Sequence, residues 1–582
     1  MNQQTFNPTD EQRDIIEHDG SVFVNACPGS GKTRVMVERA RHLFHVIKSG
    51  RGVAFLSFTK SAIFELDQRL RQEGLLSSPV FPNFIGTFDS FVWQFLVGPF
   101  GIRGCDAHPR LIPDINNTPV KLSEKSQPLP LSCFCPKTGD IINSEAKRKG
   151  FDISKKRESL IRAYKTAATS IRARLREHGC LGFDEARLVA LERIKEQAFS
   201  GMIADVLRGR FCEIIVDEAQ DCNPEDLTII TWLRDSGLSV KIVCDINQSI
   251  YEFRGGVTKH LLDFSETFPT EQRKKLTGNF RSTPNICKSI AQFRPKSTCG
   301  IPDRALGSLN DEGAPVLILS YSDKSVPSSI GTTYTTILEE ADIDVSSARI
   351  VAATKASGAA AVGQPRPDNS NQRTVQFAKA ITDFHFPSDF SDIKNAIECV
   401  HRIILEIEGY LENCTYHQYL VDNEIEPVSY RPKIISIIKA LRFDPTKYAC
   451  ARDWYKSAKN LLDCEVSIKD GKSIAQKLRW DRNLDAAFVT THVATVMPRT
   501  IHSVKGMEYP AICVVTTPPT LKGILDFLEK GEPADKAEGA RKLYVAASRA
   551  KELLVIAAPE GQAKRLQMHL SGQGADVTKR DI

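Results

Sequence analysis

The sequence predicts an α/β protein with parallel sheets that are interrupted by mainly helical insertions. One observation is the order of an apolar β-rich run, "SVFVNA", a glycine-rich loop, "CPGSGKT", and an amphipathic helix, "TRVMVERARHLFHVI". A second is the set of later apolar runs that have the pattern of buried strands and are separated by helical patterns. These runs are "CEIIVD", "PVLILSY", "ARIVAATKA", "AICVVTT" and "LLVIAA". Strands that alternate with helices form parallel sheets.

The bulk composition is that of a multidomain globular protein. The chain has 582 residues, 41% of them hydrophobic and 25% charged, which gives room for several domains with their own cores. The formal net charge of +6 permits a nucleic-acid partner without requiring one.

The N-terminal stretch "MNQQTFNPTDEQRD" is polar and lacks the apolar core of a secretory signal. No run approaches the roughly 18 apolar residues of a membrane span, so we expect no membrane partner and a cytoplasmic location. The 15 cysteines are scattered and indicate reduced thiols. One group, Cys105, His108, Cys133 and Cys135, admits a zinc site, but C-x-C is not the common ligand spacing, and a short strand or turn is favoured.

The glycine-rich loop has the strand and helix that a phosphate-binding loop requires. Gly29 and Gly31 let the backbone turn so that amide N–H groups face phosphates, and the helix N-terminus adds its positive dipole end. Lys32 is expected to reach the β- and γ-phosphates of ATP, and the hydroxyl of Thr33 to hold Mg²⁺. Ala26 stands where such loops usually open with glycine. The predicted loop comprises Ala26, Cys27, Pro28, Gly29, Ser30, Gly31, Lys32 and Thr33.

A second strand, Ile214 to Val216, ends in the acidic pair Asp217 and Glu218. We expect Asp217 to bind Mg²⁺ through water, and Glu218 to orient or deprotonate the attacking water. The alternative is an ordinary pair of acids at a strand end.

The stretch "DEAQD", from Asp217 to Asp221, resembles the second motif of superfamily 1 helicases of the UvrD/Rep/PcrA type. Further stretches resemble the other motifs of that family in the same order, from Gln12 to Lys551. They are "FNPTDEQ", "FLSFTKSA", "IGTFDSF", "VCDINQSIYEFRGG", "LTGNFRSTPNI", "TIHSVKGMEYP" and "LYVAASRAKE". The resemblance implies two RecA-like P-loop motor domains and an ATP-dependent helicase that moves 3′ to 5′ on single-stranded DNA and also acts on tailed duplexes.

The resemblance also implies how the nucleotide is held. Gln12 reads the adenine edge, Phe280 stacks on the base where the family often has tyrosine, and Arg34 lies on the other side. Glu508 binds the ribose hydroxyl.

At the γ-phosphate, the resemblance assigns Gln248 as a sensor, and Arg281 and Arg549 as arginines contributed by the second motor domain. Arg254 anchors the coupling motif to the acidic pair. Outside these motifs, such arginines are more often exposed or structural.

Aromatic side chains lie among the same motifs, and base–aromatic stacking suits a protein that grips any sequence. Phe253 stands where tryptophan is usual and Asp89 where histidine is usual, while Phe88 is equally consistent with the core. The expected single-strand-binding residues are Phe58, Thr59, Lys60, Thr87, Tyr251, Phe253 and His502.

The motifs divide the chain into four parts. The first motor domain is expected over 1–100 and 202–275, with an insertion over 101–201; the second over 276–362 and 490–582, with a helical insertion over 363–489. The first insertion holds a basic run, "SEAKRKGFDISKKRESLIRAYKTAATSIRARLREHG", which is either a solvated helix face or a DNA contact. The last stretch, "GQAKRLQMHLSGQGADVTKRDI", is expected to be a helix followed by a polar tail.

Two other functions are compatible with parts of this pattern. In one, the chain is an ATPase that senses DNA or nucleotides and regulates a separate partner nuclease, with little unwinding of its own. The sequence is similar to short UvrD-type helicases encoded beside a nuclease in antiphage defence systems such as Gabija. In the other, the phosphate loop serves a small-molecule enzyme such as a nucleotide kinase, which the ordered motifs disfavour.

Overall fold

The computed structural model of the chain describes residues 6–46, 50–123, 125–250, 258–295, 302–322, 324–364, 372–386, 393–469, 471–481, 483–488 and 496–582. The chain divides into two compact units. Unit 1 comprises residues 1–96, 190–366 and 493–582, and unit 2 comprises residues 97–189 and 367–492. None of the described helices combines the length and apolar character that a membrane crossing requires.

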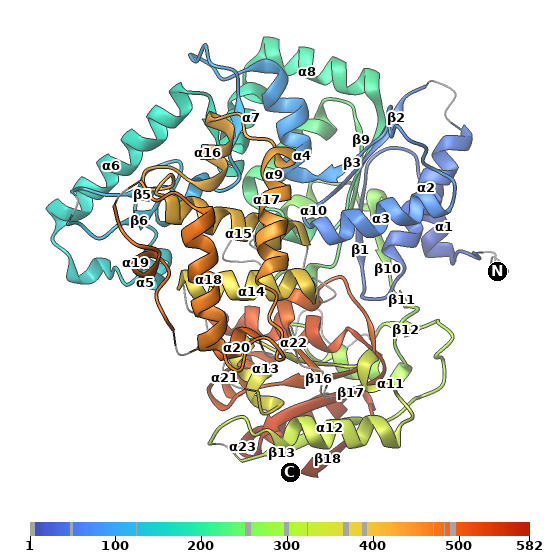
Figure 1. Cartoon of the computed structure of the whole chain (residues 1–582). Helices are drawn as coiled ribbons and strands as arrows, with labels where there is room; N and C mark the ends of the chain where they lie inside the picture. The colour runs from blue at the N-terminus through green and yellow to red at the C-terminus, as the bar shows by residue number, and fades with distance from the viewer. Residues whose placement is uncertain are drawn as a thin grey trace. The chain divides into compact units, whose positions relative to one another are not determined.

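Unit 1 contains a first six-stranded parallel sheet with the order β10-β1-β9-β8-β2-β3 (Figure 1). The early strands β1 to β3 therefore share a sheet with β8 to β10, which follow residue 200. The strands are β1 Val22–Ala26, β2 Gly52–Ser57, β3 Phe84–Thr87, β8 Phe211–Val216, β9 Ser239–Cys244 and β10 Arg273–Leu276. The helices are α1 Asp10–Glu17, α2 Lys32–Val46, α3 Lys60–Gln72, α4 Phe88–Val92, α8 Gln197–Arg210, α9 Pro224–Asp235 and α10 Thr258–Glu266.

The second sheet of unit 1 is also parallel, with the order β15-β14-β16-β17-β13-β18. The strands are β13 Val316–Tyr321, β14 Arg349–Ala352, β15 Met497–Thr500, β16 Tyr509–Val515, β17 Ala550–Pro559 and β18 Val577–Asp581. A two-stranded pair, β11 Gly278–Asn279 and β12 Arg304–Ala305, precedes it. The helices are α11 Pro284–Ala291, α12 Ser329–Glu340, α13 Lys355–Ala361, α21 Pro518–Lys530, α22 Ala537–Ala547 and α23 Glu560–Leu570. The α/β class, with two parallel sheets, is confirmed.

The end of the chain differs from its prediction. The expected polar tail forms β18, which pairs in parallel with β13 and places Val577 opposite Val316. Only Val577 of this strand is buried. An edge strand needs few apolar residues, because its outer side faces solvent, so its polar composition concealed it.

Unit 2 is mainly helical and contains both predicted insertions. Its helices are α5 Asn143–Arg148, α6 Glu158–Glu177, α14 Arg373–His385, α15 Ile393–Glu408, α16 Tyr416–Asp422, α17 Pro427–Ala440, α18 Ala451–Glu465, α19 Ile474–Lys477 and α20 Leu484–Phe488, and α7 Phe183–Lys195 continues into unit 1. Short strands β4 Arg110–Leu111 and β7 Cys180–Leu181 pair in parallel, and β5 Pro119–Val120 and β6 Leu129–Pro130 pair antiparallel.

The two insertions contact each other within unit 2. The Asp114 carboxylate accepts hydrogen bonds from the Thr415 hydroxyl (2.7 Å) and the His417 backbone N–H (3.1 Å), and Arg110 pairs with Asp422 at 3.1 Å. The chain thus groups the insertions together, whereas the predicted boundaries treat each as a separate part; those boundaries stay a prediction.

The candidate zinc residues lie in irregular segments. Cys133 ends a short 3-10 turn, and the backbone N–H of Cys135 donates to the Asp140 carbonyl at 2.8 Å. In the part of the chain that the structure describes, no group of three His, Cys, Asp or Glu side chains is placed to hold a metal ion.

A buried ion cluster lies within the first sheet and the helix α2 that packs on it. Glu213, on β8, accepts two hydrogen bonds from Arg39 (3.0 and 2.7 Å) and lies 3.6 Å from the Lys241 ammonium. All three side chains are at most 3% exposed. Burial lowers the pKa of Lys241 to about 8, although Glu213 opposes this shift.

We expect Glu213→Gln to destabilise the protein by about 3 kcal/mol at pH 7, because it leaves two buried cations without their carboxylate. Thermal unfolding followed by calorimetry would measure the loss. Glu271→Gln, at an exposed position, is the control, and equal melting temperatures for the two variants would contradict the prediction.

Candidate active site

The phosphate loop connects β1 to α2, as the sequence predicts. Gly29 and Gly31 have φ values of +70° and +76°, a region that disfavours side chains. A Cβ at Gly29 would lie 2.5 Å from the Asn279 side-chain oxygen. Ala26 is the last residue of β1 and pairs with Leu276. Because Ala26 is extended, its position does not need glycine.

Several polar groups at the loop are suited to a phosphate ligand. The Ser30 hydroxyl and the Asn279 amide nitrogen are buried without a hydrogen-bond partner among the described residues. The Gln12 amide donates to the Ser30 carbonyl at 3.1 Å. Buried polar groups without partners are costly, so the loop has unused capacity for hydrogen bonds to an anion.

The acidic pair lies at the C-terminal end of β8. The Asp217 backbone N–H bonds the Leu56 carbonyl at 2.8 Å, and its carboxylate accepts from the Glu218 N–H at 2.8 Å. Glu218 has φ of +55°, which is rare for a residue with a side chain and is typical of constrained functional sites. The backbone therefore fixes both carboxylates next to each other.

The two acids differ in how their charge is compensated. Burial and then the Glu218 carboxylate raise the pKa of Asp217 to about 7, and Lys32 only partly opposes this. Burial also acts to raise the pKa of Glu218, but the charges of Lys32, Lys505 and Arg549 outweigh it and lower that pKa. Asp217 is thus the carboxylate that lacks a sufficient positive charge, a condition that a divalent cation would relieve. Mg²⁺ uses one or two carboxylates together with phosphates and waters, so Thr33 and Asp217 fit this ion.

A buried chain of hydrogen bonds leads from Glu218 to the second sheet. The Gln220 amide donates to Glu218, and its oxygen accepts from the Asp245 N–H at 3.0 Å. The Gln248 amide donates to Asp245 at 2.8 Å and accepts from Arg549 at 2.9 Å. We call Glu218, Gln220, Asp245, Gln248 and Arg549 the coupling chain. It connects the acidic strand of the first sheet to an arginine that precedes β17 of the second.

Arg549 is 3% exposed and is held in place by further acceptors. Its guanidinium donates to the carbonyl groups of Val545 (3.0 Å) and Met507 (3.3 Å). Burial and then Arg281 lower the pKa of Arg549 to about 10, so it stays charged at neutral pH.

Arg281 and Glu508 lie together, as an ion pair at 2.9 Å. The Glu508 carboxylate also pairs with Lys551 at 2.7 Å. Although burial acts to raise its pKa, Arg281 and Lys551 lower the pKa of Glu508 to about 2.

The residues predicted to hold the base fall into two groups. Phe280 is 38% exposed, and its N–H donates to the Gly29 carbonyl at 2.8 Å, which places it at the loop with Gln12. Arg34 pairs with Glu38 at 2.6 Å and with Glu73 at 2.5 Å, and its guanidinium lies 4.9 Å from the Phe6 ring centroid. Arg34 is therefore engaged by side chains of α2, of the C-cap of α3 and of the segment before α1.

The predicted DNA contacts that the structure describes lie mainly at the ends of β2 and β3. The Phe58 ring stacks on Phe88, with centroids 5.4 Å apart, and Phe88 is fully buried. Thr59 caps α3 and Thr87 caps α4 with their hydroxyl oxygens, so both have a structural role. Among the remaining residues, Lys60 is exposed and His502 half-buried, whereas Tyr251, Phe253 and Arg254 lie outside the described residues.

Part of the chain matches a known protein family. Residues 8–269 match the model of the UvrD/REP helicase N-terminal domain. The chain is therefore similar to helicases of the UvrD/Rep/PcrA type over these residues.

Relatives extend the likeness beyond that domain. "Putative ATP-dependent DNA helicase YjcD" of Bacillus subtilis is 24% identical, over 95% of this chain and 78% of its own length. ATP-dependent DNA helicase UvrD1 of Mycobacterium tuberculosis is 28% identical over 53% of this chain. ATP-dependent DNA helicase PcrA of Staphylococcus epidermidis is 26% identical over 49% of this chain. The matched regions span 42% and 40% of UvrD1 and PcrA.

Sequence reasoning missed several charged residues of this site. The Lys505 ammonium bonds both carboxylate oxygens of Asp221 at 2.6 Å. Asp245 lies 3.4 Å from the Tyr544 hydroxyl, which accepts a hydrogen bond from Arg294 at 3.1 Å, and Arg294 pairs with Asp303. Lys505 and Asp221 lie within the motifs "TIHSVKGMEYP" and "DEAQD", but the motifs do not show that these two residues pair. No local pattern marks Arg294 or Asp303.

We expect Asp217→Asn to stabilise the nucleotide-free, Mg²⁺-free protein at pH 8. The folded state raises the pKa of Asp217 from 3.8 to about 7. Stability therefore falls as pH rises between these two values, stays reduced above pH 7, and recovers as pH falls toward 4. The variant should therefore be more stable than the parent by more than about 1.4 kcal/mol at pH 8, the equivalent of one pKa unit, and similar to it near pH 4.

Thermal unfolding across pH 4 to 8 would measure this difference, with Asp263→Asn at an exposed position as the control. A gain that does not depend on pH, or a loss at pH 8, would count against the assigned environment of Asp217.

Proposed function

We propose that the chain binds ATP at the phosphate loop with Mg²⁺ and couples its hydrolysis to 3′-to-5′ movement on single-stranded DNA and to duplex unwinding. The coupling chain is the observation that carries this proposal. In this chain the buried guanidinium of Arg549, which precedes β17, donates to Gln248. Gln248 is linked to Glu218 through Asp245 and Gln220.

In this proposal, loop amides of residues 27–33 and Lys32 hold the phosphates, and Thr33 and Asp217 hold Mg²⁺, which neutralises negative charge on the phosphates. Glu218, kept ionised by Lys32, Lys505 and Arg549, accepts a proton from the attacking water. Phe280 and Gln12 hold the base, and Glu508 the ribose.

Arg549 and Arg281 stabilise the charge that develops on the transferred phosphoryl group. Both lie in the part of unit 1 that contains the second sheet, whereas the loop and the acids lie in the part that contains the first sheet. These parts are the two halves of unit 1. Hydrolysis therefore requires the two halves to be close together. Loss of the γ-phosphate removes the ligand that both halves hold, so they can separate. The change between the closed and the open arrangement is the step that moves the DNA.

Single-stranded DNA binds at the C-terminal ends of β2 and β3, where Phe58 stacks on Phe88 and Lys60 is exposed. A stacking ring supported by a buried ring suits a base of any sequence. Tailed duplexes and single strands are the expected substrates. The 3′-to-5′ direction rests on the family resemblance alone.

A second candidate function has the same ATPase site but uses ATP hydrolysis for regulation and not for unwinding. The resemblance of the sequence to short UvrD-type helicases encoded beside a nuclease supports it. In this candidate the chain senses DNA or nucleotides and regulates a separate partner nuclease in antiphage defence, with little unwinding of its own.

Three substitutions test the ATPase assignment. Lys32→Ala should abolish ATP turnover because it removes a phosphate partner, and Glu218→Gln should bind ATP and turn over poorly. Arg549→Ala should bind ATP and lose roughly a thousandfold or more in turnover, as arginines at this position do. Steady-state ATP hydrolysis and equilibrium nucleotide binding measure these effects.

The control is Arg565→Ala, which removes an arginine paired with Asp526 and Glu529 on α21 and should retain turnover. Assays without nucleic acid, with single strands and with tailed duplexes separate the two candidates. Turnover stimulated by single strands, together with unwinding, supports the motor; stimulated turnover without unwinding supports the regulatory subunit. Full turnover by Arg549→Ala would contradict both.

A further inference from the structure

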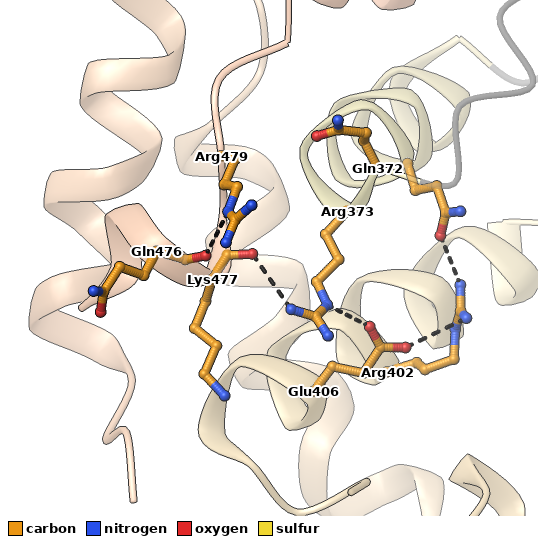
Figure 2. Close-up of a pocket in the computed structure, with 8 residues that line it drawn as sticks. Gln372, Arg373, Arg402, Glu406, Gln476, Lys477 and Arg479 are labelled. Carbon is orange, nitrogen blue, oxygen red and sulfur yellow. Dashed lines mark hydrogen bonds and ion pairs between the residues drawn. The ribbon is translucent and has the colours of Figure 1, made fainter. Parts of the chain in front are cut away.

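A polar pocket of about 670 Å³ lies within unit 2, outside the motor site. Its walls come from α14, α15 and the segment that contains and follows α19 (Figure 2). The lining residues are Gln372, Arg373, Gln376, Arg402, Glu406, Gln476, Lys477 and Arg479. The volume lies in the range of sites for small ligands.

The lining carries an excess of positive charge, with four cationic side chains and one carboxylate. Figure 2 shows the Glu406 carboxylate between the guanidinium groups of Arg373 and Arg402. Its oxygens lie 2.8 Å from Arg373 and 3.5 Å from Arg402. One carboxylate thus pairs with two arginines, and both arginine side chains remain about 40% exposed.

Arg479 adds a third guanidinium from another wall of the pocket. Its Nε donates to the Gln476 carbonyl at 3.4 Å, and no carboxylate pairs with it in the described ranges of the chain. Arg373 is also the first residue of α14, so the positive end of that helix dipole lies at the same wall. Planar guanidinium groups bind phosphate oxygens in a bidentate manner.

We propose that this pocket is a second ligand site, which binds a free nucleotide through its phosphates. Arg373, Arg402 and Arg479 hold the phosphates, and the amide nitrogens of Gln376 and Gln476 offer donors for a base or ribose. The amide oxygens of these two glutamines accept from Arg402 and from the Ser473 N–H. A concave pocket of limited volume favours a nucleotide over a nucleic-acid backbone, which needs an extended basic groove. The site goes beyond the proposed function, because none of its residues belongs to the motor site.

Isothermal titration of the full chain with ATP, GTP and inorganic triphosphate tests the proposal. The Lys32→Ala background weakens the motor site and leaves the pocket intact. In that background a nucleotide should still bind, and Arg402→Gln with Arg479→Gln should weaken this binding at least tenfold. Arg431→Gln, on α17 (Pro427–Ala440) outside the pocket, is the matched control and should bind as the background does.

Unchanged melting temperatures would show that the pocket variants are folded. Absence of nucleotide binding in the Lys32→Ala background, or binding that the pocket substitutions leave unchanged, would overturn the proposal. A parallel titration with a short duplex and with a single strand tests whether the pocket binds nucleic acid. If the pocket variants lose affinity for an oligonucleotide and not for a nucleotide, the pocket is a nucleic-acid contact and the proposal is wrong.

Discussion

Two adjacent carboxylates at the end of β8, Asp217 buried and Glu218 half-buried, impose the constraint on which the rest of unit 1 depends. Neighbouring buried acids cannot both ionise without nearby positive charge. Lys32 supplies it from the phosphate loop, and Lys505 and Arg549 supply it from the second half of unit 1. The site is consequently assembled from parts of the chain that are hundreds of residues apart, and each half of unit 1 is incomplete electrostatically without the other.

The same constraint explains why polar side chains are buried between the two halves. Gln220, Asp245 and Gln248 are each at most 2% exposed, and the hydrogen bonds of the coupling chain satisfy them. Such networks are stable when every member has a partner and costly when one is lost. A ligand that moves Arg549 therefore changes the hydrogen bonds of Gln248 and, through Asp245 and Gln220, the surroundings of Glu218.

Much of this arrangement could be predicted from the sequence, because local patterns encode it. The phosphate loop and the buried strands are each specified by residues close together in the chain, as Gly29 and Gly31 illustrate. The edge strand β18 was missed because it is almost entirely polar and lacks the alternation of polar and apolar residues that indicates a strand. Lys505 and Arg294 were missed because their roles depend on partners distant in sequence, Asp221 and Asp303. The stacking of Phe58 on Phe88 likewise depends on the pairing of β2 with β3, which neither motif states.

The most direct test of the account is a double-mutant cycle on the maximal rate of ATP hydrolysis with Gln248→Ala and Arg549→Ala. Residues that act as one unit give losses that do not multiply. If Gln248 acts by holding Arg549 against the acidic pair, the double variant should be no slower than Arg549→Ala alone. A double variant whose loss equals the product of the two single losses would show that the two residues act independently and would contradict the coupling chain.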